Sequence, residues 1–169
     1  MCSLLNVTII NVRLLRLKVI ISVNYYLHTI TIIINKIMHK IIVTGGLGFI
    51  GSNLVELLLN KKFKVINIDK ITYSSNFYNT QDYTKNSNYK FIKCDLNDKI
   101  NLSKIIFKYK PNGIFNLAAE THVDRSIDNP KNFINSNILG VFNLLEIFRK
   151  FSKINKKTRL IHISTDEVY

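Results

Sequence analysis

The sequence is poor in the residues that crosslink a chain. Its 169 residues include two cysteines, Cys2 and Cys94, which stand far apart with no second cysteine or histidine at the spacing of zinc ligands. Neither a disulfide framework nor a metal site is therefore indicated. Two prolines and 47% apolar residues argue against a disordered or collagen-like chain. The cysteine usage fits a reducing compartment, and we expect a cytoplasmic protein.

Acidic residues are also scarce. The chain has 11 Asp and Glu residues against 24 Lys and Arg residues, which gives a formal net charge of +13. A basic surface can attract the phosphates of a nucleic acid. The lysines are scattered among Asn, Ile, Tyr and Phe, however, and form no arginine-rich or aromatic-interleaved cluster. We therefore expect no nucleic-acid partner.

Residues 1–37 contain no acid at all, and they include an uncharged run from Val19 to Ile34. A membrane span needs about 20 apolar residues. This run is shorter and is interrupted by Asn24 and His28, so a membrane partner is not expected. We interpret residues 1–37 as an N-terminal extension of uncertain role, most simply one with no folded role. Targeting or membrane attachment are the alternatives.

The rest of the chain, residues 38–169, has the length of about one domain and alternates between two periodicities. Short apolar runs predict five strands, and apolar residues at helical spacing predict three helices between them. The strands are Lys40–Thr44, Lys64–Asp69, Tyr89–Lys93, Gly113–Ala119 and Arg159–Ser164, and the helices are Gly48–Asn60, Asp98–Tyr109 and Asn132–Phe151. This alternation predicts an α/β fold with a doubly wound, Rossmann-like parallel sheet in the strand order 3-2-1-4-5, ending after the fifth strand.

The turn after the first strand is rich in glycine. Gly45, Gly48 and Gly51 are spaced G-x-x-G-x-x-G where a helix begins, and Asp69 ends the next strand. Glycines allow a tight turn and a close approach to a pyrophosphate, and the carboxylate can accept hydrogen bonds from both ribose hydroxyls of adenosine. The acid would repel a 2'-phosphate, which favours NAD over NADP, although the adjacent Lys70 weakens that preference. The alternative is a structural glycine turn followed by a capping Asp.

The glycine spacing resembles that of the extended short-chain dehydrogenase/reductase superfamily. Two further segments, "NLAAETHVDRSIDNP" (116–130) and "STDEVY" (164–169), resemble the nucleotide-sugar 4,6-dehydratases, most closely those that act on dTDP-glucose. The resemblance covers residues 38–169 and implies NAD as the cofactor, a nucleotide sugar such as dTDP-glucose as the substrate, and a homodimer in the full-length family. The related UDP-glucose 4-epimerases share the glycine loop, but usually have small or hydroxyl residues where Asp166 and Glu167 stand.

The two acids near the end of the sequence fit the chemistry of a dehydratase. Loss of water across C5 and C6 of a sugar needs a base for the C5 proton and an acid for the C6 oxygen. Two carboxylates can divide these tasks if their environments separate their pKa values. The resemblance implies that Asp166 is the acid, that Glu167 is the base, and that Thr165 binds the C4 hydroxyl. The alternative is an ordinary helix start, because "STDE" is also a capping-box pattern.

The same resemblance implies a set of cofactor contacts. They are Gly45, Gly48, Phe49, Ile50, Gly51, Asp69, Lys70, Ile71, Thr72, Asp95, Leu96, Leu117, Ala118, Ala119, Glu120, Thr121 and Ser136. Within this set, Asp95 would reach the adenine amine and Thr121 would also contact the sugar. Thr121 stands where serine is common and Leu96 where isoleucine is common. As alternatives, Asp95 could cap the next helix, and His122 could be a structural histidine.

One part of the family pattern has no match in this sequence. Family members continue into a helix with a Tyr-x-x-x-Lys motif and then into a smaller substrate domain, whereas Tyr169 follows closely on Glu167 with no lysine after it. We therefore expect the N-terminal, cofactor-binding part of a dehydratase, inactive alone. An epimerase or another sugar specificity of the same superfamily is one alternative. A non-catalytic NAD-binding or partner-binding protein is another.

Overall fold

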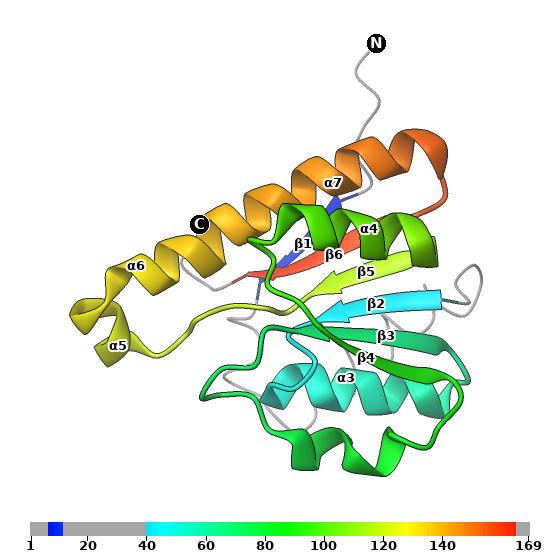
Figure 1. Cartoon of the computed structure of the whole chain (residues 1–169), viewed down its shortest axis with the longest axis horizontal. Coiled ribbons are helices and arrows are strands. Elements are labelled where there is room, and N and C mark those ends of the chain that lie inside the picture. The colour runs from blue at the N-terminus through cyan, green and yellow to red at the C-terminus, as the bar shows by residue number, and fades with distance from the viewer. Residues whose placement is uncertain (1–6, 12–39, 165–169) are drawn as a thin grey trace.

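The computed structural model describes residues 7–11 and 40–164, which form one parallel sheet with helices on both faces (Figure 1). The sheet has six strands in the order β1-β6-β5-β2-β3-β4. Their bounds are β1 Val7–Asn11, β2 Lys40–Thr44, β3 Lys64–Asp69, β4 Tyr89–Lys93, β5 Gly113–Asn116 and β6 Arg159–Ser164. Every strand pair is parallel. The carboxyl ends of the strands therefore lie along one edge of the sheet, where α/β folds bind ligands.

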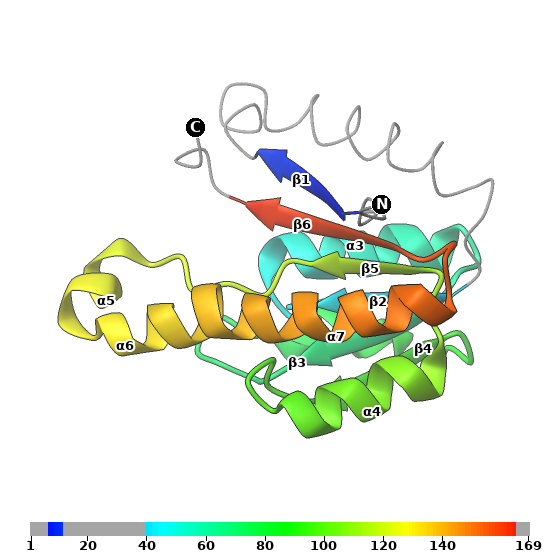
Figure 2. The ribbon, with the colours of Figure 1, turned by 90° about the horizontal axis from the view of Figure 1, so that it is seen from above.

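The helices connect the strands by crossovers over the two faces. They are α3 Phe49–Asn60, α4 Lys99–Tyr109, α5 Val123–Asp128, α6 Pro130–Phe133 and α7 Val141–Ile154, with a 3-10 helix η1 at Phe77–Tyr83 and a π-helical segment η2 at Ile134–Gly140. Helices α4 and α7 cover one face and α3 the other (Figures 1 and 2). No helix in the described ranges is long and apolar enough to cross a membrane.

The hydrophobic core has one layer on each side of the sheet. Neighbouring residues of β2 divide between them, because successive side chains of a strand point to opposite faces. Ile41 packs with Leu54 and Leu58 of α3, whereas Ile42 packs with Ile106 of α4 and Phe148 of α7. Burial on both faces explains why these strands are continuously apolar in the sequence.

The predicted strand order is confirmed. The five predicted strands pair in the order 3-2-1-4-5, and four of them have the predicted bounds. The predicted strand Gly113–Ala119 is shorter, because it ends at Asn116 and the chain then turns away along the sheet edge. The predicted helix Asn132–Phe151 is the continuous run of α6, η2 and α7, and its π-helical turn was not foreseen.

The sheet has one strand more than predicted. Residues 7–11 belong to the extension for which no folded role was expected, yet they pair with β6 in parallel, Val7 opposite Leu160 and Asn11 opposite Ser164 (Figure 2). That expectation is therefore wrong for β1. An uncovered β6 would expose a row of unpaired backbone groups, and β1 takes the position of the sixth strand in sheets of the order 3-2-1-4-5-6. The remaining residues of the extension lie outside the described ranges.

Candidate functional site

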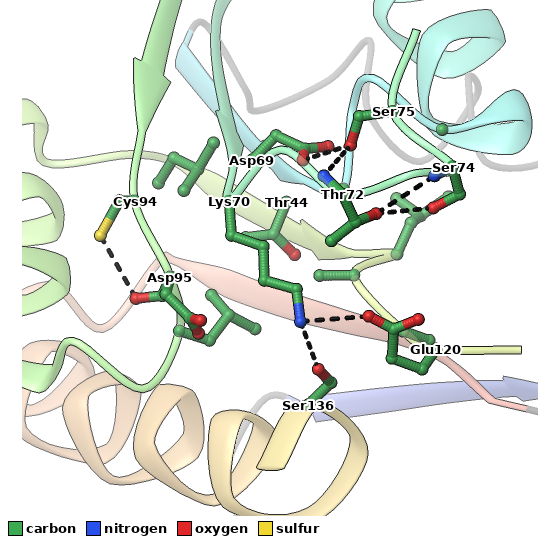
Figure 3. Close-up of a pocket in the computed structure, with 17 residues that line it drawn as sticks. Thr44, Asp69, Lys70, Thr72, Ser74, Ser75, Cys94, Asp95, Glu120 and Ser136 are labelled. Carbon is green, nitrogen blue, oxygen red and sulfur yellow. Dashed lines mark hydrogen bonds and ion pairs between the residues drawn. The ribbon is translucent and has the colours of Figure 1, made fainter. Parts of the chain in front are cut away.

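A pocket opens at the carboxyl ends of the central strands (Figure 3). It encloses about 590 Å³ of empty space, part of it open to solvent. The lining residues come from the carboxyl ends of β2 and β3, from the loops that follow β2, β3, β4 and β5, and from η2. They are Thr44, Gly45, Gly48, Ile68, Asp69, Lys70, Thr72, Ser74, Ser75, Cys94, Asp95, Leu96, Leu117, Ala118, Ala119, Glu120 and Ser136. The pocket thus lies where the strand order of the sheet reverses, at its topological switch point.

The glycine loop is packed too tightly for a side chain at Gly45 or Gly51. Gly45 has a φ of +72°, and a Cβ there would lie 2.7 Å from the backbone nitrogen of Ala118. A Cβ on Gly51 would lie 2.1 Å from the carbonyl oxygen of Gly45. Gly48 is the N-cap of α3, and in the described structure no side chain caps this helix. The first N–H groups of α3 and the positive end of its dipole are therefore available to bind an anion at the loop.

Asp69 joins the end of β3 to this loop. Its Oδ2 accepts a hydrogen bond from the backbone N–H of Leu47 at 3.1 Å. Its Oδ1 accepts from the backbone N–H of Ile71 at 2.8 Å and from the Ser75 hydroxyl at 2.9 Å. Because a carboxylate offers about four acceptor positions, roughly one remains for a ligand. Asp69 can therefore accept from both hydroxyls of a ribose only if Ser75 releases it.

The backbone at Ile71 is strained. Its φ is +64°, a conformation that is unfavourable for a β-branched side chain. The two hydrogen bonds around it, from Ile71 to Asp69 and from the Thr72 N–H to the Ser75 hydroxyl at 2.9 Å, hold the turn in this shape. Such strain is found at ligand sites more often than elsewhere.

The loop after β4 supplies three further lining residues, Cys94, Asp95 and Leu96, and its two polar side chains are neither a nucleophile nor a helix cap. Asp95 accepts a hydrogen bond from the backbone N–H of Asn97 at 2.9 Å, whereas α4 is capped by Asp98, which accepts from the Asn101 N–H at 3.1 Å. The alternative role of Asp95 as the helix N-cap is therefore wrong. Burial, together with the negative charges of Asp98 and Asp95, raises the pKa of the Cys94 thiol to about 11. Cys94 is thus an unreactive thiol at neutral pH.

The π-helical segment η2 contacts three of the pocket loops through consecutive residues. The carbonyl of Asn135 accepts from the Asn97 side chain at 3.0 Å, and the Ser136 hydroxyl accepts from Lys70 at 2.6 Å. Asn137 pairs with the backbone of Glu120, since its Oδ1 accepts the Glu120 N–H and its Nδ2 donates to the Glu120 carbonyl, each at 2.8 Å. This segment therefore holds the loops after β3, β4 and β5 in fixed positions around the pocket.

A buried polar row crosses β2, β5 and β6 beside the pocket. The Thr44 hydroxyl donates to Oδ1 of Asn116, whose Nδ2 lies 2.8 Å from Nδ1 of His162. An amide nitrogen can only donate, so His162 accepts through an unprotonated Nδ1. Burial lowers the pKa of His162 below its ordinary value. The row aligns the ends of three strands just before β6 reaches Ser164.

Most of the predicted cofactor residues meet in this one pocket. Its lining includes twelve of them: Gly45, Gly48, Asp69, Lys70, Thr72, Asp95, Leu96, Leu117, Ala118, Ala119, Glu120 and Ser136. Phe49, Ile50, Gly51, Ile71 and Thr121 do not line it with their side chains; Phe49 is 81% exposed at the start of α3. Five lining residues were missed: Thr44, Ile68, Ser74, Ser75 and Cys94. Two of the missed residues, Ser74 and Ser75, are adjacent serines soon after Asp69, and this pair was a signal in the sequence.

The predicted catalytic residues Thr165, Asp166 and Glu167 lie outside the described residues. The structure nevertheless places their neighbour Ser164 at the carboxyl end of β6. Thr121 and His122 are exposed in the loop before α5. The Nδ1 of His122 lies 4.0 Å from Oδ2 of Asp124. His122 is therefore a surface histidine in this structure.

Comparison with known proteins connects this pocket to a family. The family model described as GDP-mannose 4,6 dehydratase matches residues 42–169. The chain belongs to this family. The predicted resemblance to the nucleotide-sugar 4,6-dehydratases is thereby confirmed.

Individual relatives agree with the family match. The dTDP-glucose 4,6-dehydratase of Neisseria meningitidis is 44% identical over 138 residues, which are 78% of this chain and 39% of that protein. A crystal structure of dTDP-glucose 4,6-dehydratase from Bacillus anthracis in complex with NAD is 37% identical with a TM-score of 0.64, and the match covers 77% of this chain and 38% of that one. The chain thus spans about two fifths of the length of these relatives.

Epimerases also share the fold. The structure of UDP-glucose 4-epimerase from Thermus thermophilus, in complex with NAD, is 31% identical with a TM-score of 0.59, and the match covers 67% of this chain and 34% of that one. The parallel α/β architecture predicted from the sequence is therefore common to dehydratase and epimerase relatives.

Proposed function

We propose that this chain binds NAD as the N-terminal, cofactor-binding part of a dTDP-glucose 4,6-dehydratase. The observation that supports this most strongly is the hydrogen bond from Leu47 in the glycine loop to Asp69 at the end of β3. It places a buried carboxylate beside the anion-binding end of α3, and these are the two groups that an adenine dinucleotide needs for its ribose and its pyrophosphate.

The residues present fit this cofactor. In the glycine loop, a Cβ at position 45 or 51 would clash with backbone atoms, so these two positions need glycine. The pyrophosphate would bind the first N–H groups of α3 at Phe49 and Ile50, and the ribose would bind Asp69. Asp95 would accept from the adenine amine. The nicotinamide side would lie against residues 117–121.

The dehydration itself is proposed for residues near the carboxyl end of β6. When bound, NAD would serve as the reversible acceptor of the hydride from C4 of the sugar. Thr165 would hold the C4 hydroxyl, Glu167 would remove the C5 proton, and Asp166 would protonate the departing C6 oxygen. The polar row that ends at His162 supports this assignment, because it fixes the strand that leads directly to these residues.

We propose that the chain performs no dehydration by itself. The C4 hydroxyl needs a general base, which typically contributes about 100-fold to 10,000-fold in rate. The Thr165 hydroxyl is a poor candidate, because an alcohol of ordinary pKa is almost never ionised near neutral pH. The chain spans 39% of the Neisseria relative, and the base and the sugar-binding residues are expected in the remainder.

The full-length protein is proposed to form a homodimer. An apolar stripe on η2 and α7 offers a surface for it, because Ile134, Ile138, Phe142 and Leu145 recur at helical spacing and are 49%, 60%, 55% and 36% exposed. Exposed apolar stripes of this kind commonly mark protein contacts.

The NAD proposal is tested by isothermal titration of the 169-residue chain with NAD, and with GDP as a nucleotide of another base. We expect saturable binding of NAD with one site per chain and weaker binding of GDP, because Asp95 can accept from an adenine amine and would face a carbonyl oxygen of guanine. Equal affinity for both, or no binding of NAD, would contradict the proposal.

Epimerisation of a UDP-sugar is the second candidate, because the Thermus epimerase shares the fold and 31% of the sequence. Asp166 and Glu167 argue against it. A non-catalytic NAD-binding protein would also bind the cofactor. In such a protein Asp166 and Glu167 would have no catalytic role, whereas the leading proposal assigns one to each.

A further inference from the structure

Lys70 is the only basic side chain among the described residues that line the pocket, whereas three acids, Asp69, Asp95 and Glu120, line it as well. It follows directly after Asp69, the predicted ligand of the adenosine ribose. A cation at this point is what a 2'-phosphate on that ribose would need, as in proteins that bind NADP. From the sequence alone, Asp69 favours NAD over NADP, and the adjacent Lys70 weakens that preference.

The structure shows that this cation is already engaged elsewhere. The Lys70 ammonium lies 3.2 Å from Oε1 of Glu120 and donates a hydrogen bond to the Ser136 hydroxyl at 2.6 Å. Figure 3 shows its side chain extending away from Asp69 to reach these two partners. The Glu120 side chain is only 10% exposed, so water screens this ion pair poorly.

The two partners of Lys70 are themselves fixed. Asn137 holds the backbone of Glu120 through two hydrogen bonds of 2.8 Å, and Ser136 is its neighbour in η2. The backbone of Glu120 is therefore tied to the same segment, η2, that carries Ser136, so both partners of Lys70 are held at η2. Lys70 can leave them only by exposing a nearly buried carboxylate without its counter-charge, which is unfavourable.

We propose that Glu120 is a specificity-determining residue for the cofactor. By holding Lys70 with Ser136 on the side of the pocket away from Asp69, it withholds the pocket's cation from a 2'-phosphate, while Asp69 repels that phosphate directly. Glu120 thus acts through Lys70 and makes the pocket selective for an unphosphorylated ribose. This inference rests on the proposed binding of an adenine dinucleotide.

The test compares two probes that differ by one phosphate, 5'-AMP and adenosine 2',5'-bisphosphate, titrated into the whole chain at low ionic strength. The quantity measured is the ratio of their dissociation constants. We expect the wild-type chain to prefer 5'-AMP, and Glu120→Gln to reduce that preference by roughly tenfold, because the released Lys70 can swing toward the ribose on its flexible stem. Urea unfolding of the variant, which depends on neither probe, reports whether it is folded.

Two further variants separate this role from a general charge effect. Glu146→Gln makes the same change at an exposed ion pair on α7, away from the pocket, and should leave the ratio unchanged. In a Lys70→Met background, Glu120→Gln should no longer change the ratio by more than about twofold, since the effect acts through Lys70.

The outcomes are distinct. Binding of neither probe by the wild-type chain would overturn both this inference and the proposed function. Binding of 5'-AMP with an unchanged ratio in Glu120→Gln would overturn the inference alone. A tenfold gain that persists in the Lys70→Met background would also overturn it, because loss of one negative charge from the pocket would then explain the effect.

Discussion

Leu47 and Asp69, which lie 22 residues apart in the sequence, are joined by a hydrogen bond of 3.1 Å between the backbone N–H of the former and Oδ2 of the latter. This bond connects the glycine loop after β2 to the end of β3. The carboxylate that is proposed to bind the ribose therefore also sets the shape of the loop proposed to bind the pyrophosphate. Stability and nucleotide affinity should respond together when it is changed.

Asp69→Asn should weaken both properties. Asp69 is 7% exposed and accepts hydrogen bonds from Leu47, Ile71 and Ser75. In Asp69→Asn, an amide NH2 group replaces one carboxylate oxygen and faces a group that also donates. The buried donors are then left without an acceptor, which costs about 1–3 kcal/mol of stability. Urea unfolding and titration with 5'-AMP measure the two effects. Asp95→Asn is the matched change in the same pocket, and it should weaken nucleotide binding with a much smaller loss of stability.

Gly51→Ala should be more damaging than Gly48→Ala. A Cβ on Gly51 would lie 2.1 Å from the Gly45 carbonyl oxygen, whereas a Cβ on Gly48 meets the same atom at 3.3 Å. Relief of the first clash requires the backbone of the loop to move, and we expect a loss of about 1–3 kcal/mol in unfolding free energy. Thermal or urea unfolding of the two variants tests this. Equal losses would mean that the loop is not packed as the structure has it.

Deletion of residues 1–37 should leave NAD affinity unchanged, because the pocket lies at β2 to β5 and, among the described strands, β1 pairs only with β6. The same deletion should lower the melting temperature, since β6 loses its neighbour. Deletion of residues 1–6, which retains β1, is the control and should lower it less. A loss of affinity in the longer deletion would show that the extension contributes to the cofactor site.

Stability should decrease as the pH falls below about 6.5, the ordinary pKa of histidine. Burial lowers the pKa of His162 in the folded chain. The unfolded chain therefore binds a proton at a higher pH than the folded chain, and stability is lost as the pH falls from the ordinary pKa toward the lowered one. Urea unfolding at several pH values tests this. His162→Gln should flatten the profile, whereas His122→Gln, at an exposed histidine, should leave it unaltered.

The sequence was sufficient to predict five of the six strands and most of the pocket, because these rest on local patterns. The order of the five strands was predicted from the right-handed crossovers of alternating strands and helices. Continuous apolar runs marked β2 to β6, and three glycines followed by Asp69 marked the loop. Particular contacts between residues far apart in the sequence could not be predicted from local patterns. The pairing of β1 with β6 depends on two apolar segments at opposite ends of the chain, and periodicity does not tell which strands meet. The ion pair of Lys70 with Glu120 depends likewise on how η2 packs over the loops.

The central claim is that this chain is the cofactor-binding part of a dTDP-glucose 4,6-dehydratase, and a chimera tests it most directly. The 169 residues would be joined to the C-terminal part of the Neisseria meningitidis relative, and the reaction followed by NMR in deuterium oxide with dTDP-glucose as substrate.

We predict that the chimera forms the 4-keto-6-deoxy product with deuterium at C5, while the 169-residue chain alone forms none. Glu167→Gln in the chimera should abolish exchange at C5 and still allow NAD reduction, and Asp166→Asn should mainly slow loss of the C6 hydroxyl. Turnover by the chain alone, or a folded, NAD-binding chimera that leaves dTDP-glucose unchanged and epimerises UDP-glucose instead, would contradict the claim.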